Sequence, residues 1–209
     1  MISIIIVDDH AVVRKGLIQI LEEYSDTYVV DEASSGDELL EKVKTQSYDI
    51  IVLDISMQGR DGIDTLKHLR RQNVTSKVLA FSMYPEEQYA IRLIKAGAVG
   101  YLNKECAPDE FLKAIERVSK GGKYVSPELA ELLLKNVDVD GAPLHDSLSD
   151  REFQVMCMMA KGKSPSSIAV DLGLSINTVS TYRIRILEKL NLKHSAEITH
   201  YAIKNKLVE

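Results

Sequence analysis

The sequence predicts two domains of different class: an α/β domain with a parallel sheet, followed by a small all-α domain. Five apolar runs, each followed by an amphipathic segment of helical length, fill about the first 120 residues. From Ser149 onward the chain shows helix signals alone. The charge also divides, because residues 1–146 carry 17 Lys+Arg and 25 Asp+Glu, whereas residues 147–209 carry 9 and 6. An acidic first part and a mildly basic second part indicate two modules with different partners.

The apolar runs predict five strands of one sheet. The first run, residues 2–7, is almost entirely apolar, which is typical of a strand covered on both faces. The other strand candidates are residues 28–33, 49–53, 77–82 and 99–102. Each is followed by apolar residues at helical spacing, in segments around residues 12–21, 39–43, 63–69, 85–96 and 108–119. Because strand and helix alternate, we expect parallel strands with helices on both faces of the sheet.

Helix start signals predict the second domain. Ser149 and Glu152 form a capping-box pattern, and helices are expected over residues 165–172, over residues 175–190, and after Ser195 as far as about Lys206. Residues 126–135 predict a short helix, and residues 136–146 mix Asp, Gly, Pro and His as a linker would. The expected organisation is a first domain over residues 1–122, a linker with a short helix over residues 123–146, and a second domain over residues 147–209.

Composition argues against a membrane or secreted protein. No run approaches the roughly 18 apolar residues of a membrane span. The apolar N-terminus is short, lacks a basic flank and leads into two acids, so it does not resemble a secretory signal. Cys106 and Cys157 lack the spacing of metal ligands. We therefore expect a reduced, cytoplasmic protein without a structural disulfide and without a membrane partner.

Charged and polar residues stand where the predicted strands end. Asp8 and Asp9 follow the first strand, Asp54 ends the third, Ser82 ends the fourth and Lys104 follows the fifth. In a parallel sheet these positions converge at one edge. Clustered carboxylates need a cation, and oxygen ligands without His or Cys favour Mg²⁺. A lysine and a hydroxyl beside a carboxylate and a metal suit a phosphoryl group, which the carboxylate itself can accept as an aspartyl phosphate.

Each of these residues also has a structural explanation. An Asp at a strand end is often a helix cap, a Ser after a strand is usually a turn residue, and a single Lys is usually solvated. Their joint occurrence at four strand ends is what favours a site.

The first 120 residues or so resemble the receiver domain of bacterial two-component response regulators. The matching segments are Val7-Asp8-Asp9-His10, Leu53-Asp54-Ile55-Ser56-Met57 with Gly59 and Asp61-Gly62, Ser82, and residues 97–104. The resemblance implies a flavodoxin-like fold with a five-stranded parallel sheet.

The resemblance also implies roles for particular residues. Asp54 would be the phosphoacceptor. Asp9, Asp54 and the Ser56 backbone carbonyl would bind Mg²⁺ directly, with Asp8 bound through water. Three further residues would respond to the phosphoryl group: Lys104 would pair with it, Ser82 would swing toward it, and Tyr101 would turn inward as an aromatic switch. The alternative for Tyr101 is an ordinary half-buried aromatic residue of a strand.

Three departures from the family pattern concern the surroundings of Asp54. Gln58 stands where the family usually has Pro, which loosens the turn but removes no chemical group. Met83 follows Ser82 where a small residue is common, so it could crowd access to the site. Ser56 and Tyr84 occupy positions that, by resemblance, set how fast the aspartyl phosphate hydrolyses.

The second domain predicts a helix-turn-helix, formed by residues 165–172, Gly173-Leu174 and residues 175–190. In this motif the second helix enters the major groove of DNA. Small polar residues at its start suit phosphates or base edges, and its basic residues suit phosphates or guanine. The candidate DNA contacts are Ser175, Asn177, Thr178, Ser180, Thr181, Tyr182, Arg183, Arg185 and Lys189. The alternative is a helical bundle whose basic face is merely solvated.

Four segments resemble the LuxR-type DNA-binding domain. They are residues 148–152, 167–169, 174–179 and 187–190. A receiver joined to this domain is the pattern of the NarL/FixJ class of response regulators. Ser180 and Tyr182 stand where Lys and His are common, a version found in the GacA/BvgA-like branch.

The resemblance implies a transcription regulator rather than an enzyme. A sensor histidine kinase would phosphorylate Asp54, and the phosphorylated chain would form a homodimer on promoter DNA, with RNA polymerase as a further candidate partner. The phosphate would then be lost slowly by self-hydrolysis. Two alternatives stay open. A phosphohydrolase with an aspartate nucleophile usually has a second Asp two residues later, where this chain has Ser56. An adaptor would bind protein through its second domain, without salt-sensitive DNA binding.

Overall fold

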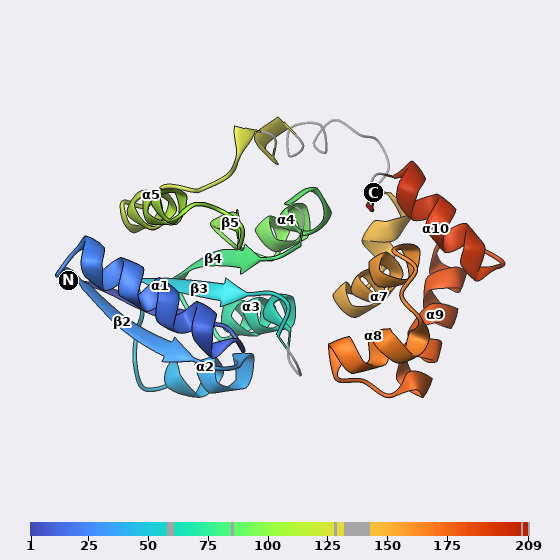
Figure 1. The fold of residues 1–209 in the computed structure, drawn as a ribbon, viewed down its shortest axis with the longest axis horizontal. Coiled ribbons are helices and arrows are strands. Elements are labelled where there is room, and N and C mark those ends of the chain that lie inside the picture. The colour runs from blue at the N-terminus through green and yellow to red at the C-terminus, as the bar shows by residue number, and fades with distance from the viewer. Residues whose placement is uncertain (58–60, 85, 128, 132–142, 206, 209) are drawn as a thin grey trace. The chain divides into compact units, whose positions relative to one another are not determined.

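The computed structural model describes residues 1–57, 61–84, 86–127, 129–131, 143–205 and 207–208 (Figure 1). The chain divides into two compact units, Met1–Leu134 and Lys135–Glu209. Several sequence expectations fall wholly or partly outside the described residues: the turn at Gln58, most of the linker, and the end of the last helix at Lys206. Of the short helix expected over residues 126–135, the structure describes a start at Pro127, where the Leu129 N–H donates to Ser126 Oγ over 2.9 Å.

A parallel sheet of five strands forms the first unit, in the order β2-β1-β3-β4-β5. Its strands are β1 (Ile2–Val7), β2 (Tyr28–Ala33), β3 (Ile50–Asp54), β4 (Lys77–Ser82) and β5 (Gly100–Asn103). Asp54 pairs with Phe81, and Ser82 pairs with Asn103, so the carboxyl ends of β3, β4 and β5 stand level. The predicted α/β class and the parallel sheet are confirmed, with β3 and β5 each one residue later than expected.

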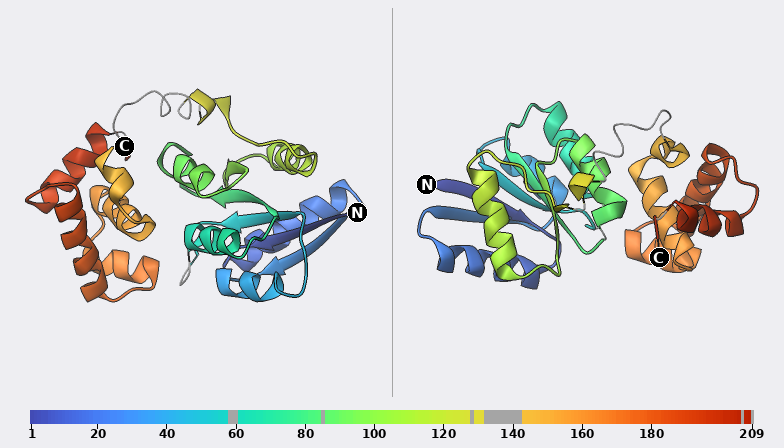
Figure 2. Two further views of the ribbon diagram at one scale, coloured as in Figure 1. Left: turned by 180° about the vertical axis from the view of Figure 1, so that it is seen from behind. Right: turned by 90° about the horizontal axis from the view of Figure 1, so that it is seen from above.

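Helices lie on both sides of this sheet (Figures 1 and 2). They are α1 (Ala11–Tyr24), α2 (Gly36–Lys42), α3 (Gly62–Arg71), α4 (Glu86–Lys95) and α5 (Pro108–Ser119). The apolar sides of α1 and α5 pack on one face through Leu17, Leu21, Phe111 and Ile115. Successive β1 residues Ile4, Ile5 and Ile6 are all fully buried. A strand covered on both faces therefore explains the unbroken apolar run seen in the sequence.

The start of α3 lies close to the end of β3. Asp61 caps α3 by accepting a hydrogen bond from the Asp64 N–H over 2.8 Å. Gly62 approaches the end of β3 so closely that a Cβ there would lie 2.3 Å from the Asp54 carbonyl oxygen. Only glycine fits at this distance, and the close approach fixes the backbone that carries Asp54.

The second unit is helical throughout its described residues. A short 3₁₀ helix, η1 (Leu144–Ser147), precedes α7 (Asp150–Ala160), α8 (Pro165–Leu172), α9 (Ile176–Lys189) and α10 (Ser195–Lys204). The predicted capping box is present, with Ser149 and Glu152 each accepting from the other's backbone N–H. The core contains buried side chains from all four α-helices; these include Phe153, Ile168, Val179, Ile186 and Ile198.

The helix-turn-helix is formed by α8 and α9. Ser164 and Ser175 cap the two helices by accepting from the Ser167 and Thr178 N–H groups. Gly173 ends α8 in the left-handed region at φ 63°, where glycine has no steric penalty. The last helix differs by one residue from the sequence expectation, since α10 begins at Ser195 and follows His194, which makes no side-chain cap. Within the described residues, no helix is long and apolar enough to cross a membrane.

Candidate functional site

Three side chains from distant parts of the sequence meet at the carboxyl edge of the first unit's sheet. Lys104 Nζ lies 2.6 Å from Asp8 Oδ2 and 2.8 Å from Asp54 Oδ2. The side chains are buried, with exposed fractions of 8% for Lys104, 1% for Asp8 and 0% for Asp54. Parallel pairing of β1, β3 and β5 through their neighbours brings their ends together, as the strand-end argument requires.

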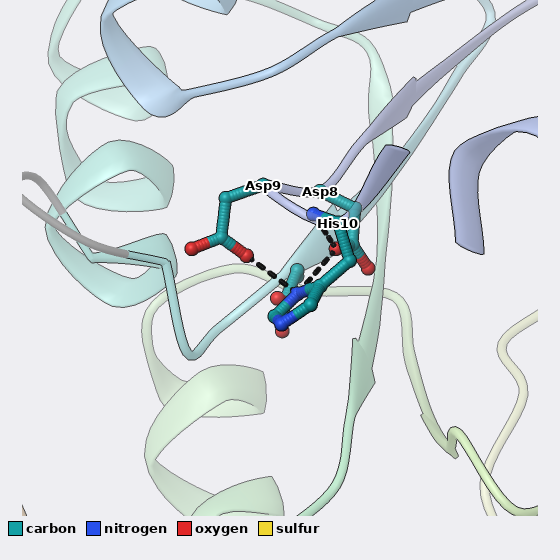
Figure 3. Close-up of side chains that lie close together, drawn as sticks. Asp8, Asp9 and His10 are labelled. Atoms are coloured by element: carbon teal, nitrogen blue, oxygen red, sulfur yellow. Dashed lines mark hydrogen bonds and ion pairs between the residues drawn. The ribbon is translucent and has the colours of Figure 1, made fainter. Parts of the chain in front are cut away.

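Asp9 and His10 complete the cluster (Figure 3). His10 Nδ1 lies 2.8 Å from Asp9 Oδ1 and 3.2 Å from Asp8 Oδ1, while the His10 N–H donates to Asp8 Oδ1 over 2.8 Å. One ligand atom from each of Asp8, Asp9, His10 and Asp54 lies within 4.8 Å of all the others. Sequence reasoning missed His10, although its place next to Asp9 was the available signal.

The donor set suits a hard divalent cation. Three carboxylates converge where Lys104 supplies one buried positive charge, so a further cation would balance the charge. The Ser56 N–H donates to Asp54 Oδ1 over 3.0 Å, which orients that carboxylate. Oxygen atoms dominate the set, as expected for Mg²⁺.

Burial and the charges of neighbouring groups together set the pKa values of Asp54 and Lys104. Burial raises the pKa of Asp54, the charge of Asp8 adds to the rise, and Lys104 and the Ser56 N–H oppose it. Burial alone would lower the pKa of Lys104, but the charges and hydrogen bonds of Asp54 and Asp8 raise it overall. Lys104 is therefore held as a cation against the Asp54 carboxylate.

Ser82 and Tyr101 share Tyr84 as a hydrogen-bond partner. Ser82 is fully buried, and its Oγ accepts from the Tyr84 N–H over 3.1 Å. Tyr101 is 2% exposed, and its hydroxyl donates to the Tyr84 carbonyl over 2.5 Å. The Tyr84 ring stacks on Tyr89 with ring centres 4.6 Å apart. Met83 is 56% exposed, so most of its side chain faces solvent.

The predicted DNA contacts lie on the exposed sides of α9 or at its start. Val179, Ile186 and Leu190 are buried and define the inner side of the helix. The exposed members of the predicted set are Ser175, Asn177, Thr181, Arg183, Arg185 and Lys189. The half-buried members are Thr178, Ser180 and Tyr182.

Several members of this set make contacts within the chain, and the contacts of Ser175, Arg183 and Lys189 bear most on their roles. Ser175 Oγ accepts from the Thr178 N–H over 3.0 Å and caps the helix. Arg183 Nη1 donates to Ser195 Oγ over 3.3 Å, a weak and exposed contact. Lys189 Nζ lies 2.7 Å from Glu152 Oε2, whose side chain is 3% exposed, and it also donates to the Ser147 carbonyl over 3.2 Å. Lys189 therefore ties α9 to the start of α7, which sequence reasoning did not anticipate.

Comparison with protein-family models now identifies the class. Residues 4–116 match the response regulator receiver domain, and residues 146–202 match the luxR family of bacterial regulatory proteins. The chain therefore belongs to the response regulators, with a receiver domain and a LuxR-type DNA-binding domain. This is the NarL/FixJ architecture, and the resemblance seen in the sequence is confirmed.

Individual relatives match along almost the whole chain. The response regulator UvrY of Escherichia coli K12 is 35% identical over 209 residues, covering 99% of this chain and 96% of UvrY. The response regulator GacA of Pseudomonas aeruginosa PAO1 is 34% identical over 212 residues, covering 100% and 99%. Among solved structures, the Salmonella typhimurium RcsB response regulator has a TM-score of 0.59 at 25% identity, covering 97% of this chain and 98% of that one. The response regulator ChrA of a heme-sensing two-component system has a TM-score of 0.52 at 30% identity, covering 99% of this chain and 98% of that one.

Proposed function

We propose that this response regulator accepts a phosphoryl group on Asp54 from a sensor histidine kinase and then binds promoter DNA as a homodimer. One observation carries the proposal: the Lys104 ammonium lies between the buried carboxylates of Asp8 and Asp54. A cation held at this position is suited to a phosphoryl oxygen on Asp54. A cytoplasmic location follows from these two partners.

In the phosphoryl transfer, a carboxylate oxygen of Asp54 attacks phosphorus and the bond from phosphorus to the donor nitrogen or oxygen breaks. Asp8, Asp9, Asp54 and the Ser56 carbonyl would hold Mg²⁺, which neutralises charge on the phosphoryl oxygens. Lys104 would pair with one of these oxygens, exchanging part of its present contact with Asp54. The phosphate is then lost by slow self-hydrolysis, at a rate that Ser56 and Tyr84 would tune.

The switch would pass through Tyr84. Phosphorylation adds about −1.5 to −2 charge beside Lys104. The Ser82 hydroxyl oxygen now accepts a hydrogen bond from the Tyr84 N–H. If this hydroxyl turns to the phosphoryl group, that hydrogen bond breaks. Tyr101, which donates to the Tyr84 carbonyl, would follow that movement. The surface around α4 and β5 would thereby change and favour dimerisation.

The DNA contact would be made by α9. A solved structure of the relative RcsB concerns the interaction of that protein with DNA. Asn177 and Thr181 are exposed and lie one helical turn apart, where they would face base edges. Arg183 and Arg185 would contact phosphates or guanine. Ser175 and Thr178 at the helix start would contact phosphate, with Ser180 and Tyr182 beside them, and Lys189 would act mainly by holding the helix. RNA polymerase is a further candidate partner at the promoter.

The test is the intact mass after incubation with Mg²⁺ and acetyl phosphate. We expect one phosphate on the native chain, none on Asp54→Asn, and one on the control Asp26→Asn, which changes an exposed aspartate of the same unit. Phosphate on Asp54→Asn at the native level would overturn the assignment. DNA binding is then measured with treated and untreated protein at several salt concentrations, because phosphate contacts make affinity salt-dependent.

A further inference from the structure

An isoleucine stands on the outward side of the recognition helix. Ile184 in α9 (Figure 1) is 50% exposed, whereas Val179 and Ile186 on the inner side are 1% and 0% exposed. A helix turns about 100° per residue, so Ile184 lies on the same side as Asn177, seven positions earlier, and Thr181, three positions earlier. One apolar side chain therefore lies within the surface expected to face DNA.

The polar side chains near Ile184 lie to its sides on the surface of the helix. The Thr181 hydroxyl donates to the Asn177 carbonyl over 3.0 Å, so this donor is engaged within the helix. Arg183 and Arg185 are adjacent to Ile184 in sequence, which puts them about 100° to either side of it. Ile184 thus presents hydrocarbon between two cationic flanks, and the flanks are where phosphates of a bound groove would lie.

We propose that Ile184 is a specificity-determining residue that contacts the C5 methyl group of thymine in the major groove. The inference rests on the proposed DNA binding and adds to it the base that is read. Thymine alone presents a methyl group in that groove, and an apolar side chain is the partner that recognises it. Exposed isoleucines are common on protein surfaces, and Ile176 at the start of α9 is itself 52% exposed, so the position of Ile184 on this face is what carries the argument.

The size of the effect follows from the area of one methyl group. Burying a methyl-sized group contributes roughly 0.8 kcal/mol, which corresponds to about a fourfold change in affinity at 25 °C. Replacing thymine by deoxyuridine removes this methyl group and leaves every hydrogen-bonding atom of the base pair in place. The substitution therefore isolates the contact that Ile184 would make.

The experiment first selects an operator from random duplex DNA with the full chain treated with acetyl phosphate and Mg²⁺. Each thymine of the operator is then replaced in turn by deoxyuridine, and dissociation constants are measured for the native chain, Ile184→Ala and Ile203→Ala. The control Ile203 is 54% exposed and lies on α10. We expect one thymine per half-site at which deoxyuridine costs the native chain and Ile203→Ala about fourfold, and Ile184→Ala nothing.

The outcomes separate the two proposals. An enriched operator whose thymine positions respond equally in the native chain and in Ile184→Ala overturns the role of Ile184 while DNA binding stands. An operator without any methyl-sensitive position does the same. A pool from which no sequence is enriched overturns the proposed DNA binding, and the inference about Ile184 with it.

Discussion

The sheet-edge site and the exposed face of α9 are built in opposite ways. Asp8 and Lys104 are 96 positions apart in the sequence, yet they form a buried ion pair. The α9 residues are consecutive and mostly exposed. The first site is assembled by the fold and is charged before any ligand arrives, whereas the second is a surface whose chemistry is completed by its partner. Substitutions at the sheet edge should therefore change stability, and those on α9 should change affinity.

Lys104→Met should have the largest effect. Removing one partner of a buried ion pair leaves charges without compensation, at a cost of roughly 3–5 kcal/mol in general. Because burial already raises the pKa of Asp54, that carboxyl can take up a proton, and we expect about 2–3 kcal/mol. Calorimetry in EDTA at pH 7 should show the loss in one unit only. The control Lys120→Met removes an exposed lysine paired with Glu116 and should leave the unfolding transitions of both units unchanged.

Lys189→Met sharpens the comparison, because this α9 residue pairs with the almost buried Glu152. Burial alone would raise the pKa of Glu152, but Lys189 and Ser149 lower it overall. The stabilisation that the pair of Lys189 and Glu152 gives to the second unit is therefore present above the ordinary glutamate pKa. It is lost as pH falls through the lowered pKa of Glu152. We expect the second unit to lose about 1 kcal/mol at pH 7, and less in acid.

The salt dependence of DNA binding distinguishes Lys189 from Arg185. Arg185→Ala should leave stability unchanged and reduce the slope of log affinity against log salt by about 0.9, the value for one lost phosphate contact. Lys189→Met should leave that slope unchanged, as should the control Lys161→Met. A reduced slope for Lys189→Met would instead return this lysine to the set of DNA contacts.

The same contrast explains what the sequence could predict. The sheet followed from the alternation of apolar runs and helical segments. The convergence of Asp8, Asp54 and Lys104 followed from the strand ends, because parallel strands finish at one edge. The side-chain contact between His10 and Asp9 was missed, because it depends on the rotamers of adjacent residues. The partner of Lys189 was missed too, because Glu152 lies 37 positions away on another helix. Periodicity identifies an exposed basic face, but it does not reveal which cations the fold has already paired.

Asp54→Asn should stabilise the first unit. The raised pKa of Asp54 means that ionising it costs stability, so the native chain loses stability as pH rises from the ordinary aspartate pKa through the raised value. The variant lacks this loss and should gain on the order of 1 kcal/mol at pH 7 in EDTA. Saturating Mg²⁺ should narrow the gap, because the cation stabilises the native chain more. A variant less stable than the native chain in EDTA would show that the Lys104 pair outweighs the repulsion.

Among the three first-unit sites tested, Lys104, Asp54 and Tyr101, the substitution Tyr101→Phe should have the smallest effect on stability, and it separates packing from switching. The variant keeps the buried ring and loses the hydrogen bond to the Tyr84 carbonyl. A neutral hydrogen bond contributes about 0.5–1.5 kcal/mol, and we expect a loss near the lower limit. The control Tyr124→Phe loses an exposed bond to Glu110 and should be neutral. Phosphate uptake, measured by intact mass, should be unchanged, because the lost hydroxyl donates to the Tyr84 carbonyl, whereas the proposed transfer takes place on Asp54. If the hydroxyl couples Tyr84 to the dimer surface, the phosphorylated variant should dimerise more weakly in sedimentation velocity, and an unchanged dimer would leave Tyr101 as a core residue alone.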